Sequence, residues 1–222
     1  APDKLYTNNQ LAKEGVYPKG GDATEFLSLI KESGVDCIDM AVEFKNAKID
    51  QYDMYFKTDH HWTAEGAFFA FQKTCELMKN EYGYEIDSKF IDINEYKIDT
   101  YEDYFTGSEG TRTGRIYSGK DDFSLIYPKF STSLRLENFD IPSQTQNCKS
   151  SEGDFYNALY DMSKFNKGWA YTYQTFLSGD NALKIIKNYN SESNKKILLV
   201  RDSFGNSFAP FLSLICDELY IV

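Results

Sequence analysis

Histidine, positive charge and long apolar runs are all scarce in this sequence. Its 222 residues include only two histidines, and 24 lysines and arginines face 34 aspartates and glutamates, for a net charge of -10. A chain this acidic is repelled by nucleic acid phosphates, so we expect no nucleic-acid partner. No apolar run approaches the ~20 residues of a membrane-spanning helix. The four cysteines match no zinc-binding spacing and are Cys37, Cys75, Cys148 and Cys216.

Length and composition favour one globular domain. A chain of 222 residues that is 41% hydrophobic and 16% aromatic can bury a full core. It has no linker-like stretch, so we expect a single domain over residues 1–222, with ends that look clipped. The pattern that indicates helices and strands is weakest in the middle of the chain, and residues 83–165 are predicted to be an insertion. Within it we expect a loop at 105–120 and a hairpin made of strands 123–127 and 133–136.

Helical spacing is clear in three segments. Apolar residues predict a helix at 22–33, stopped by Gly34, and a long helix to about Tyr82 whose N-cap is Thr63. A further helix is predicted at 206–216. Each of these helices adjoins a short apolar run, which indicates an α/β organisation.

The apolar runs predict buried strands at 35–40, 196–200 and 219–222. Lys196–Val200 is uninterrupted, which is the pattern of a central strand in a parallel sheet. Asp39, near the end of the first run, is interpreted as a capping or loop carboxylate. The pattern therefore predicts an α/β fold with a mostly parallel sheet.

Both histidines lie in the stretch Thr58-Asp-His-His-Trp-Thr63, directly ahead of the long helix. Histidine is the usual general base because its pKa lies near neutral pH. In an extended backbone, residues i and i+2 point to the same side. We therefore expect Asp59 to orient the ring of His61, and His60 to point the opposite way.

A second motif, Arg201-Asp-Ser-Phe-Gly205, follows the strand at 196–200. Open α/β sheets place their active sites at the carboxyl ends of strands, and the N–H groups of a helix start can stabilise an oxyanion. We interpret Ser203 as a nucleophile and Asp202 as a cap. Each motif alone has a plainer alternative: an N-cap at Asp202-Ser203, and an inert hydrogen-bonded loop at the histidines.

The two motifs carry a family resemblance. Thr58–Thr63 with Glu65–Ala67 resembles the DHHW family of bacterial proteins, as does Leu198–Gly205 with Pro210–Leu212. This family is similar to the alginate O-acetyltransferases, and both are SGNH-hydrolase-like. The resemblance covers the chain from about residue 35 to its end. It implies a three-layer α/β/α fold with a mostly parallel central sheet.

The resemblance also implies site residues and a chemistry that needs no metal or cofactor. The matches to nucleophile, base and acid are Ser203, His61 and Asp59. The further candidates for the oxyanion hole or for substrate contacts are Gly179, Asn181, His60 and Trp62. Together they imply a serine esterase or O-acetyltransferase that forms an acyl-Ser203 intermediate. The sequence leaves open whether water or a sugar hydroxyl then takes the acyl group.

By resemblance, the substrate is a carbohydrate polymer or a small acyl ester, and the protein is extracellular or attached to the cell surface, with acyl-transfer partners in the cell envelope. One alternative is a non-catalytic glycan-binding domain with the same fold. Another is a metal-dependent phosphoesterase that uses Asp59, His60 and His61, with Asp39 and Asp202 as further ligands. The chain has no third histidine to complete such a site, and this alternative leaves Ser203 unexplained.

Overall fold

The computed structural model describes residues 22–139 and 148–222, which form a mixed α/β fold with two β-sheets. The parts of the domain prediction that fall on residues 1–21 and 140–147 lie outside the described residues. The larger sheet has the strand order β4-β3-β5-β7-β6. Its strands are β3 (Leu134–Phe139), β4 (Lys149–Gly153), β5 (Leu183–Asn188), β6 (Lys196–Leu199) and β7 (Glu218–Ile221). β6 and β7 are parallel, whereas the other neighbouring pairs are antiparallel.

Two sequence expectations about this sheet are therefore wrong: the sheet is not mostly parallel, and Lys196–Val200 is not central. Among the described strands β6 pairs only with β7 and lies at the edge. Its apolar run misleads because one face is open to solvent, with Leu198 65% and Val200 75% exposed. The parallel pair comes from one β6-α8-β7 crossover, in which helix α8 spans Gly205–Leu212.

The strand expected at 35–40 is also absent. Residues 35–39 belong to no strand, and helix α3 (Met40–Asn46) begins directly after them. Asp39 is the N-cap of α3, because its Oδ1 accepts a hydrogen bond from the Ala41 N–H at 3.0 Å. The capping role predicted for Asp39 is thus confirmed. The run misleads because it has no sheet to join here, and Val35 stays 55% exposed.

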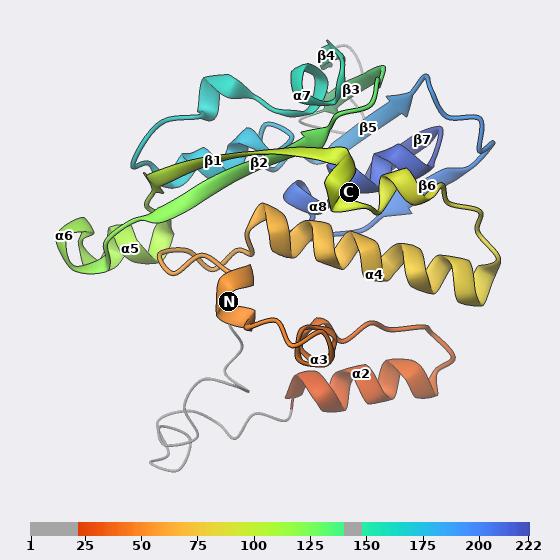
Figure 1. Ribbon diagram of the computed structural model, residues 1–222, viewed down its shortest axis with the longest axis horizontal. Coiled ribbons are helices and arrows are strands. Elements are labelled where there is room, and N and C mark those ends of the chain that lie inside the picture. The colour runs from red at the N-terminus through yellow and green to blue at the C-terminus, as the bar shows by residue number, and fades with distance from the viewer. Residues whose placement is uncertain (1–21, 140–147) are drawn as a thin grey trace.

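The predicted helices are confirmed as α2 (Asp22–Glu32), α4 (Ala64–Tyr82) and α8, which is shorter than expected. Thr63 caps α4 by accepting the Gly66 N–H at 3.2 Å, and α4 ends at Gly83, whose φ of 61° suits glycine. Figure 1 shows α4 running below the sheets, with α2 and α3 below α4. No helix among the described residues is long and apolar enough to cross a membrane.

The smaller sheet pairs β1 (Tyr96–Phe105) with β2 (Asp121–Pro128) in antiparallel register. The expected hairpin of strands 123–127 and 133–136 is therefore wrong, since the second of these segments lies in β3 of the larger sheet. The five residues after Pro128 carry the chain from one sheet to the other. The expected loop at 105–120 instead contains two helices, α5 (Ser108–Thr113) and α6 (Arg115–Ser118).

Short helices lie in several of the other connections that the structure describes. One is the α-helix α7 (Phe155–Leu159), and the others are 3₁₀-helices. They are η1 (Gln51–Met54), η2 (Ser88–Phe90), η3 (Ile93–Glu95), η5 (Met162–Lys164), η6 (Ala170–Thr175) and η7 (Ser213–Ile215). η6 matters most for the site because it contains Tyr173, whose ring stacks on the ring of His61.

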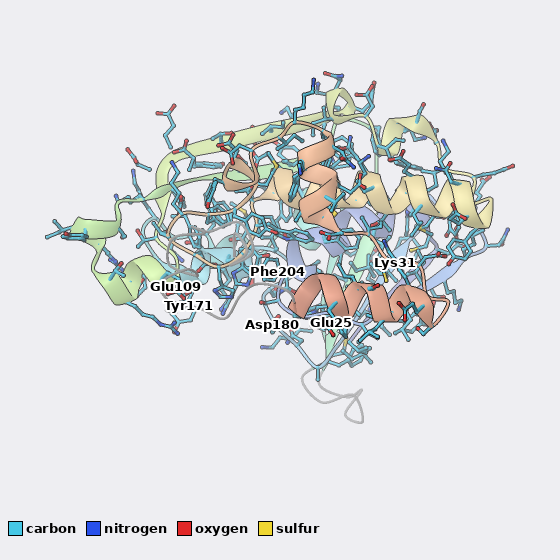
Figure 2. The ribbon with its side chains drawn as sticks, turned by 90° about the horizontal axis from the view of Figure 1, so that it is seen from below. Glu25, Lys31, Glu109, Tyr171, Asp180 and Phe204 are labelled. Atoms are coloured by element: carbon cyan, nitrogen blue, oxygen red, sulfur yellow. The ribbon has the colours of Figure 1, made fainter. Side chains whose placement is uncertain are left out.

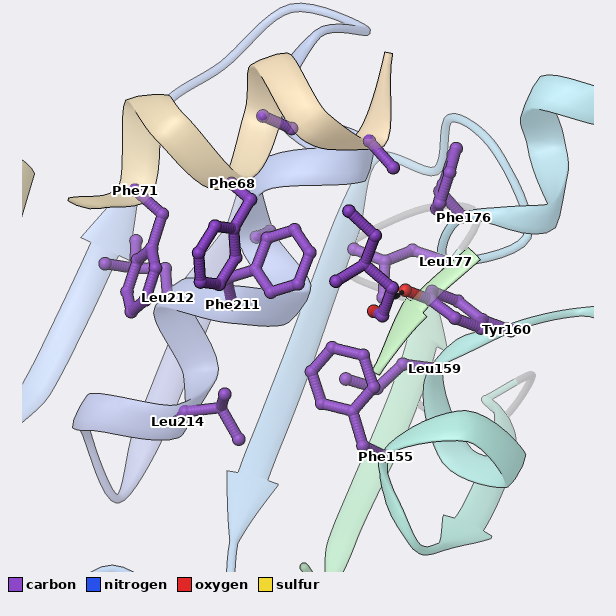
Figure 3. Close-up of a cluster of buried hydrophobic side chains, with 14 of the residues drawn as sticks. Phe68, Phe71, Phe155, Leu159, Tyr160, Phe176, Leu177, Phe211, Leu212 and Leu214 are labelled. Atoms are coloured by element: carbon purple, nitrogen blue, oxygen red, sulfur yellow. Dashed lines mark hydrogen bonds between the residues drawn. The ribbon is translucent and has the colours of Figure 1, made fainter. Parts of the chain in front are cut away.

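An aromatic core joins these elements. Phe68 and Phe71 of α4 pack against Phe211 of α8, with ring centroids 5.1 Å and 6.1 Å apart (Figure 3). Phe56, which precedes the two histidines, packs on Phe105 and Phe123 at 4.7 Å and 5.7 Å. Each fully buried phenylalanine contributes about 1.5–3 kcal/mol, so the histidine loop is anchored at its base.

Candidate active site

The loop that carries the two histidines folds back on itself before α4. Tyr55 and Trp62 form an isolated antiparallel bridge, and the Phe56 N–H donates to the carbonyl of His61 at 3.1 Å. The Thr63 N–H donates to the carbonyl of Met54 at 2.9 Å. These bonds place the Asp-His-His segment at the tip of a closed loop.

His61 links Asp59 to Ser203. Its Nδ1 is hydrogen-bonded to Oδ1 of Asp59, and its Nε2 lies 2.7 Å from Oγ of Ser203. A proton on Nδ1 would leave Nε2 free to accept the serine hydroxyl. The hydrogen bonds expected for His61 are therefore present, while the catalytic roles of the three residues stay predictions.

The Asp59 carboxylate is nearly buried, at 6% exposure. Burial raises its pKa, but hydrogen bonds from the His61 side chain and from the Ser108 N–H outweigh this and lower the pKa to about 2. The Ser108 N–H donates to Oδ2 at 2.7 Å. Asp59 therefore holds its negative charge beside the imidazole at neutral pH.

Ser203 lies in the turn between β6 and α8. The side chain of Asp202 accepts the Phe204 N–H at 3.0 Å, as a cap would, and the Ser203 carbonyl accepts the Asn206 N–H at 3.2 Å. These bonds fix the turn and leave the hydroxyl of Ser203 directed at His61.

His60 departs from its predicted direction. It does not point away from His61, because the two ring centroids lie 3.9 Å apart. The loop is bent here, so the i, i+2 alternation of an extended strand does not apply. Its Nδ1 lies 3.2 Å from Oγ of Ser108, and its side chain is 44% exposed. Burial and the neighbouring charge of His61 lower the pKa of His60.

Trp62 joins the two sequence motifs. Its indole N–H donates to the Phe204 carbonyl at 3.0 Å and to Oγ of Ser207 at 2.8 Å. Oγ of Ser207 in turn lies 3.0 Å from the hydroxyl of Tyr173, whose ring stacks on His61 at 3.8 Å. Sequence reasoning missed Tyr173, which is one of many aromatic residues. Ser207 was foreseeable, because it lies one helical turn after Ser203.

Asp121 and Gly107 were missed as well, because they lie far away in the sequence. Asp121 accepts the N–H groups of Lys57 and Thr58 at 2.9 Å and 2.8 Å, so it anchors the start of the histidine loop. Gly107 passes so close to Asp59 that an added Cβ would come within 2.1 Å of the Asp59 Cβ. Glycine is therefore required where α5 begins.

Gly179 and Asn181, the oxyanion candidates, each have a hydrogen bond to a residue outside the Ser203 turn. The Gly179 N–H donates to the Phe176 carbonyl at 3.1 Å, and Asn181 Oδ1 accepts from Nζ of Lys184 at 2.8 Å. Asp180, between them, reaches the turn of Ser203 by accepting from Asn206 Nδ2 at 2.8 Å. The oxyanion role of the pair stays a prediction.

Asp59, His60 and His61 each offer a ligand atom, and these atoms lie within 4.8 Å of one another. Such a group could in principle hold a metal ion. In the described structure, however, both ring nitrogens of His61 and both oxygens of Asp59 already take part in hydrogen bonds. Asp39 and Asp202, the further ligands of the metal alternative, are engaged as caps. This bonding suits proton transfer better than metal ligation.

Comparison with known proteins places this geometry in context. A family model described as DHHW protein matches residues 35–222. A solved DHHW family protein from Eubacterium siraeum is 24% identical, with a TM-score of 0.54 over 77% of this chain and 51% of that one. Bacillus cereus PatB1, solved with a sulfonyl adduct, is 20% identical, with a TM-score of 0.70 over 93% of this chain and 65% of that one.

A second PatB1 structure gives 21% identity and a TM-score of 0.68. At these identities the similarity concerns the fold. The chain spans between about half and two thirds of the length of these solved proteins. No curated protein matches the chain.

Proposed function

Because the chain belongs to the DHHW family, we propose that Ser203, His61 and Asp59 are the nucleophile, base and orienting acid of an SGNH-like serine acyltransferase or esterase. The observation that carries the proposal is the continuous chain of hydrogen bonds from Asp59 through both ring nitrogens of His61 to the hydroxyl of Ser203. Nucleophile, base and orienting group in hydrogen-bond reach are the general signature of nucleophilic catalysis.

In the first half-reaction, Oγ of Ser203 attacks the carbonyl carbon of an ester while its proton passes to Nε2 of His61. The charge of Asp59 stabilises the imidazolium that forms. The C–O bond of the ester then breaks, and the departing alkoxide takes the proton from His61. The products are the acyl-Ser203 ester and an alcohol.

In the second half-reaction, the hydroxyl of an acceptor gives its proton to His61 and attacks the acyl-Ser203 carbonyl. Breaking the bond to Ser203 returns the proton to Oγ and releases the acylated acceptor. Water as acceptor makes the protein an esterase, and a sugar hydroxyl makes it an O-acetyltransferase. The acceptor we propose is an extracellular or cell-surface polysaccharide, and the chemistry requires no cofactor.

The sulfonyl adduct in PatB1 supports the proposal. Sulfonyl reagents react with activated nucleophiles, and PatB1 shares this fold over 93% of the chain. An extracellular location at the bacterial cell envelope is proposed from the family resemblance alone.

The experiment measures acyl-enzyme formation directly. The parent is mixed with p-nitrophenyl acetate or phenylmethylsulfonyl fluoride, and peptide mass spectrometry locates the adduct. We expect modification at Ser203, loss of turnover in Ser203→Ala and His61→Ala, and no change in Ser150→Ala, which removes an exposed serine. Circular dichroism checks folding. Equal turnover in the parent and both site variants would overturn the acyl-enzyme and favour a glycan-binding domain.

A further inference from the structure

Two large aromatic side chains in the segment that leads to Tyr173 are exposed to solvent. Trp169 is 54% exposed and Tyr171 is 63% exposed. Tyr173, two residues on in η6, is buried and stacks on His61. A 3₁₀-helix advances about 2 Å per residue, so Tyr171 lies about 4 Å along the axis from Tyr173. Figure 2 labels Tyr171, Phe204 and Asp180 on the face seen from below.

We call the segment from Trp169 to Tyr173 the first wall. A second wall starts at Asp59 and His60. The first residue of α5, Ser108, donates its N–H to Asp59 at 2.7 Å and lies 3.2 Å from the ring of His60. From there α5 and α6 lead outward, as Figure 1 shows at the end of β1 and β2. Both helices are largely exposed beyond Gly110. This wall therefore runs from the site into solvent.

The outer ends of the two walls are in contact. The guanidinium carbon of Arg115 lies 5.7 Å from the centroid of the Trp169 ring, a cation–π distance. One wall thus starts at Asp59 and the other at His61, and they converge at Arg115 and Trp169. The two segments that leave the site carry the exposed rings of Trp169 and Tyr171 and the guanidinium of Arg115.

We infer that Trp169, Tyr171 and Arg115 form a binding platform for a sugar ring of the acyl acceptor. The choice of a saccharide rests on the function proposed above, in which a sugar hydroxyl must reach acyl-Ser203. The C–H groups on one face of a pyranose ring stack on indole and phenol rings. The guanidinium offers several N–H donors to ring hydroxyls or to a sugar carboxylate.

This platform would decide the outcome of the second half-reaction. A sugar stacked beside Ser203 places a hydroxyl near the acyl group and displaces water. Tryptophan and tyrosine lose little side-chain entropy on binding because only two torsions become fixed. An exposed aromatic pair in the segment that leads to Tyr173 therefore suits a transferase, which must favour a bound acceptor over the solvent.

Tryptophan spectroscopy tests the platform directly, because the chain contains only two tryptophans. The indole N–H of Trp62 is bonded inside the fold, so Trp62 serves as an internal reference. Ser203→Ala protein labelled with ¹⁵N is titrated with chitotetraose and, separately, with a mannuronate tetramer. The Trp169→Phe variant assigns the two indole signals in the ¹H–¹⁵N spectrum.

We expect at least one sugar to shift the Trp169 signal saturably while the Trp62 signal stays nearly constant. Tyr171→Ala should weaken this binding about five-fold. Tyr189→Ala is the matched control: Tyr189 is 54% exposed, compared with 63% for Tyr171, and follows β5, whereas Asp180 precedes the opposite end of that strand. Its loss should leave binding unchanged.

Three results would overturn the platform: no saturable shift with either sugar, equal loss of binding in Tyr171→Ala and Tyr189→Ala, or a Trp169 signal that moves on dilution without sugar. The last result would assign the surface to contact between copies of the chain. Because the titration uses Ser203→Ala protein, it does not depend on turnover. Failure of the acyl-enzyme and failure of the platform are therefore separate results.

Discussion

Asp121 and Thr58, 63 positions apart in the chain, are joined by two hydrogen bonds. Oδ2 of Asp121 accepts the Thr58 N–H at 2.8 Å and the Thr58 hydroxyl at 2.6 Å. Oγ1 of Thr58 also accepts the Gly107 N–H at 2.9 Å. The buried Asp121 carboxylate thereby sets the position of the residue directly before Asp59. It ties the histidine loop to β2 and to the start of α5.

Asp121→Asn should weaken both the fold and the activity. The amide replaces one carboxylate oxygen with an N–H donor, which must face a donor of Lys57 or Thr58. A buried unmade hydrogen bond costs about 1–3 kcal/mol, and a small displacement of His61 lowers kcat/KM by about ten- to a hundred-fold. Thermal unfolding and p-nitrophenyl acetate turnover measure the two effects.

Asp122→Asn is the control for Asp121→Asn, because Asp122 is adjacent but exposed and accepts one N–H bond, from Asp103. It should change stability by no more than about 0.5 kcal/mol. Equal effects of the two variants would refute the supporting role of Asp121.

Trp62→Phe should loosen the connection between the histidine loop and the Ser203 turn. Phenylalanine keeps an aromatic ring near Phe204, now 5.5 Å away, but it cannot donate to the Phe204 carbonyl or to Ser207. Two lost bonds correspond to about 1–3 kcal/mol of stability. Turnover should fall because the hydroxyl of Ser203 is no longer held at His61.

A double-mutant cycle with Ser207→Ala tests this connection. Ser207 contacts both Trp62 and Tyr173, so the two substitutions should be non-additive by at least about 0.5 kcal/mol. Additive free energies of unfolding would show that the shared network does not couple these residues.

The sequence predicts the parts of this molecule that depend on local order. Thr63 caps α4 and Asp202 caps the Ser203 turn through neighbours two or three residues away, so both were visible in one segment. Asp59 and His61 pair across two residues for the same reason. Their meeting with Ser203 could be proposed only because the two motifs occur together.

Contacts between residues that are far apart in the sequence could not be predicted in this way. The pairing of β3 with β5 and the edge position of β6 depend on which strands from distant parts of the sequence lie beside them. An apolar run is compatible with a parallel or an antiparallel neighbour. Asp121 looks like any surface aspartate in the sequence, and nothing near Tyr173 indicates that its ring covers His61. The domain boundaries and the oxyanion roles of Gly179 and Asn181 stay predictions.

Asp59→Asn should lower turnover and change the acid stability of the protein. The amide cannot stabilise the imidazolium of His61, so kcat should fall about 10³-fold or more, by analogy with other triads. The folded pKa of Asp59 is lowered to about 2, from an unfolded value near 4, so the carboxylate stabilises the fold above about pH 4. This contribution is lost as the pH falls toward 2.

The free energies of unfolding of the parent and of Asp59→Asn, measured between pH 6 and pH 2, check the direction of this pH dependence. The extra stability of the parent over the variant should shrink across the lower half of this range. A constant or growing advantage would contradict the ionised, hydrogen-bonded state of Asp59.

Lys184 is a fully buried lysine of β5, with 0% exposure. Its Nζ donates to the Leu177 carbonyl and, at 2.8 Å, to Oδ1 of Asn181. Burial lowers its pKa to about 7, and the charge of Arg201 adds to this effect. Since the unfolded pKa is near 10.4, the folded state resists protonation. The contribution of Lys184 to stability is therefore greatest above about pH 10 and is lost as the pH falls toward 7.

Lys184→Met removes this titration and keeps an apolar side chain in the same space. Between about pH 10 and pH 7 the parent should lose stability relative to Lys184→Met, with a slope of up to about 1.4 kcal/mol per pH unit, and the difference should level off below pH 7. Lys187→Met, from the same strand but with a 37% exposed side chain, controls for removal of one charge. Chemical denaturation at each pH gives the three curves. A stability difference from the parent that changes with pH by the same slope in Lys184→Met and Lys187→Met would contradict this prediction. In that case the buried amine does not titrate between about pH 7 and pH 10, and the carbonyls around Lys184 hold it as a cation.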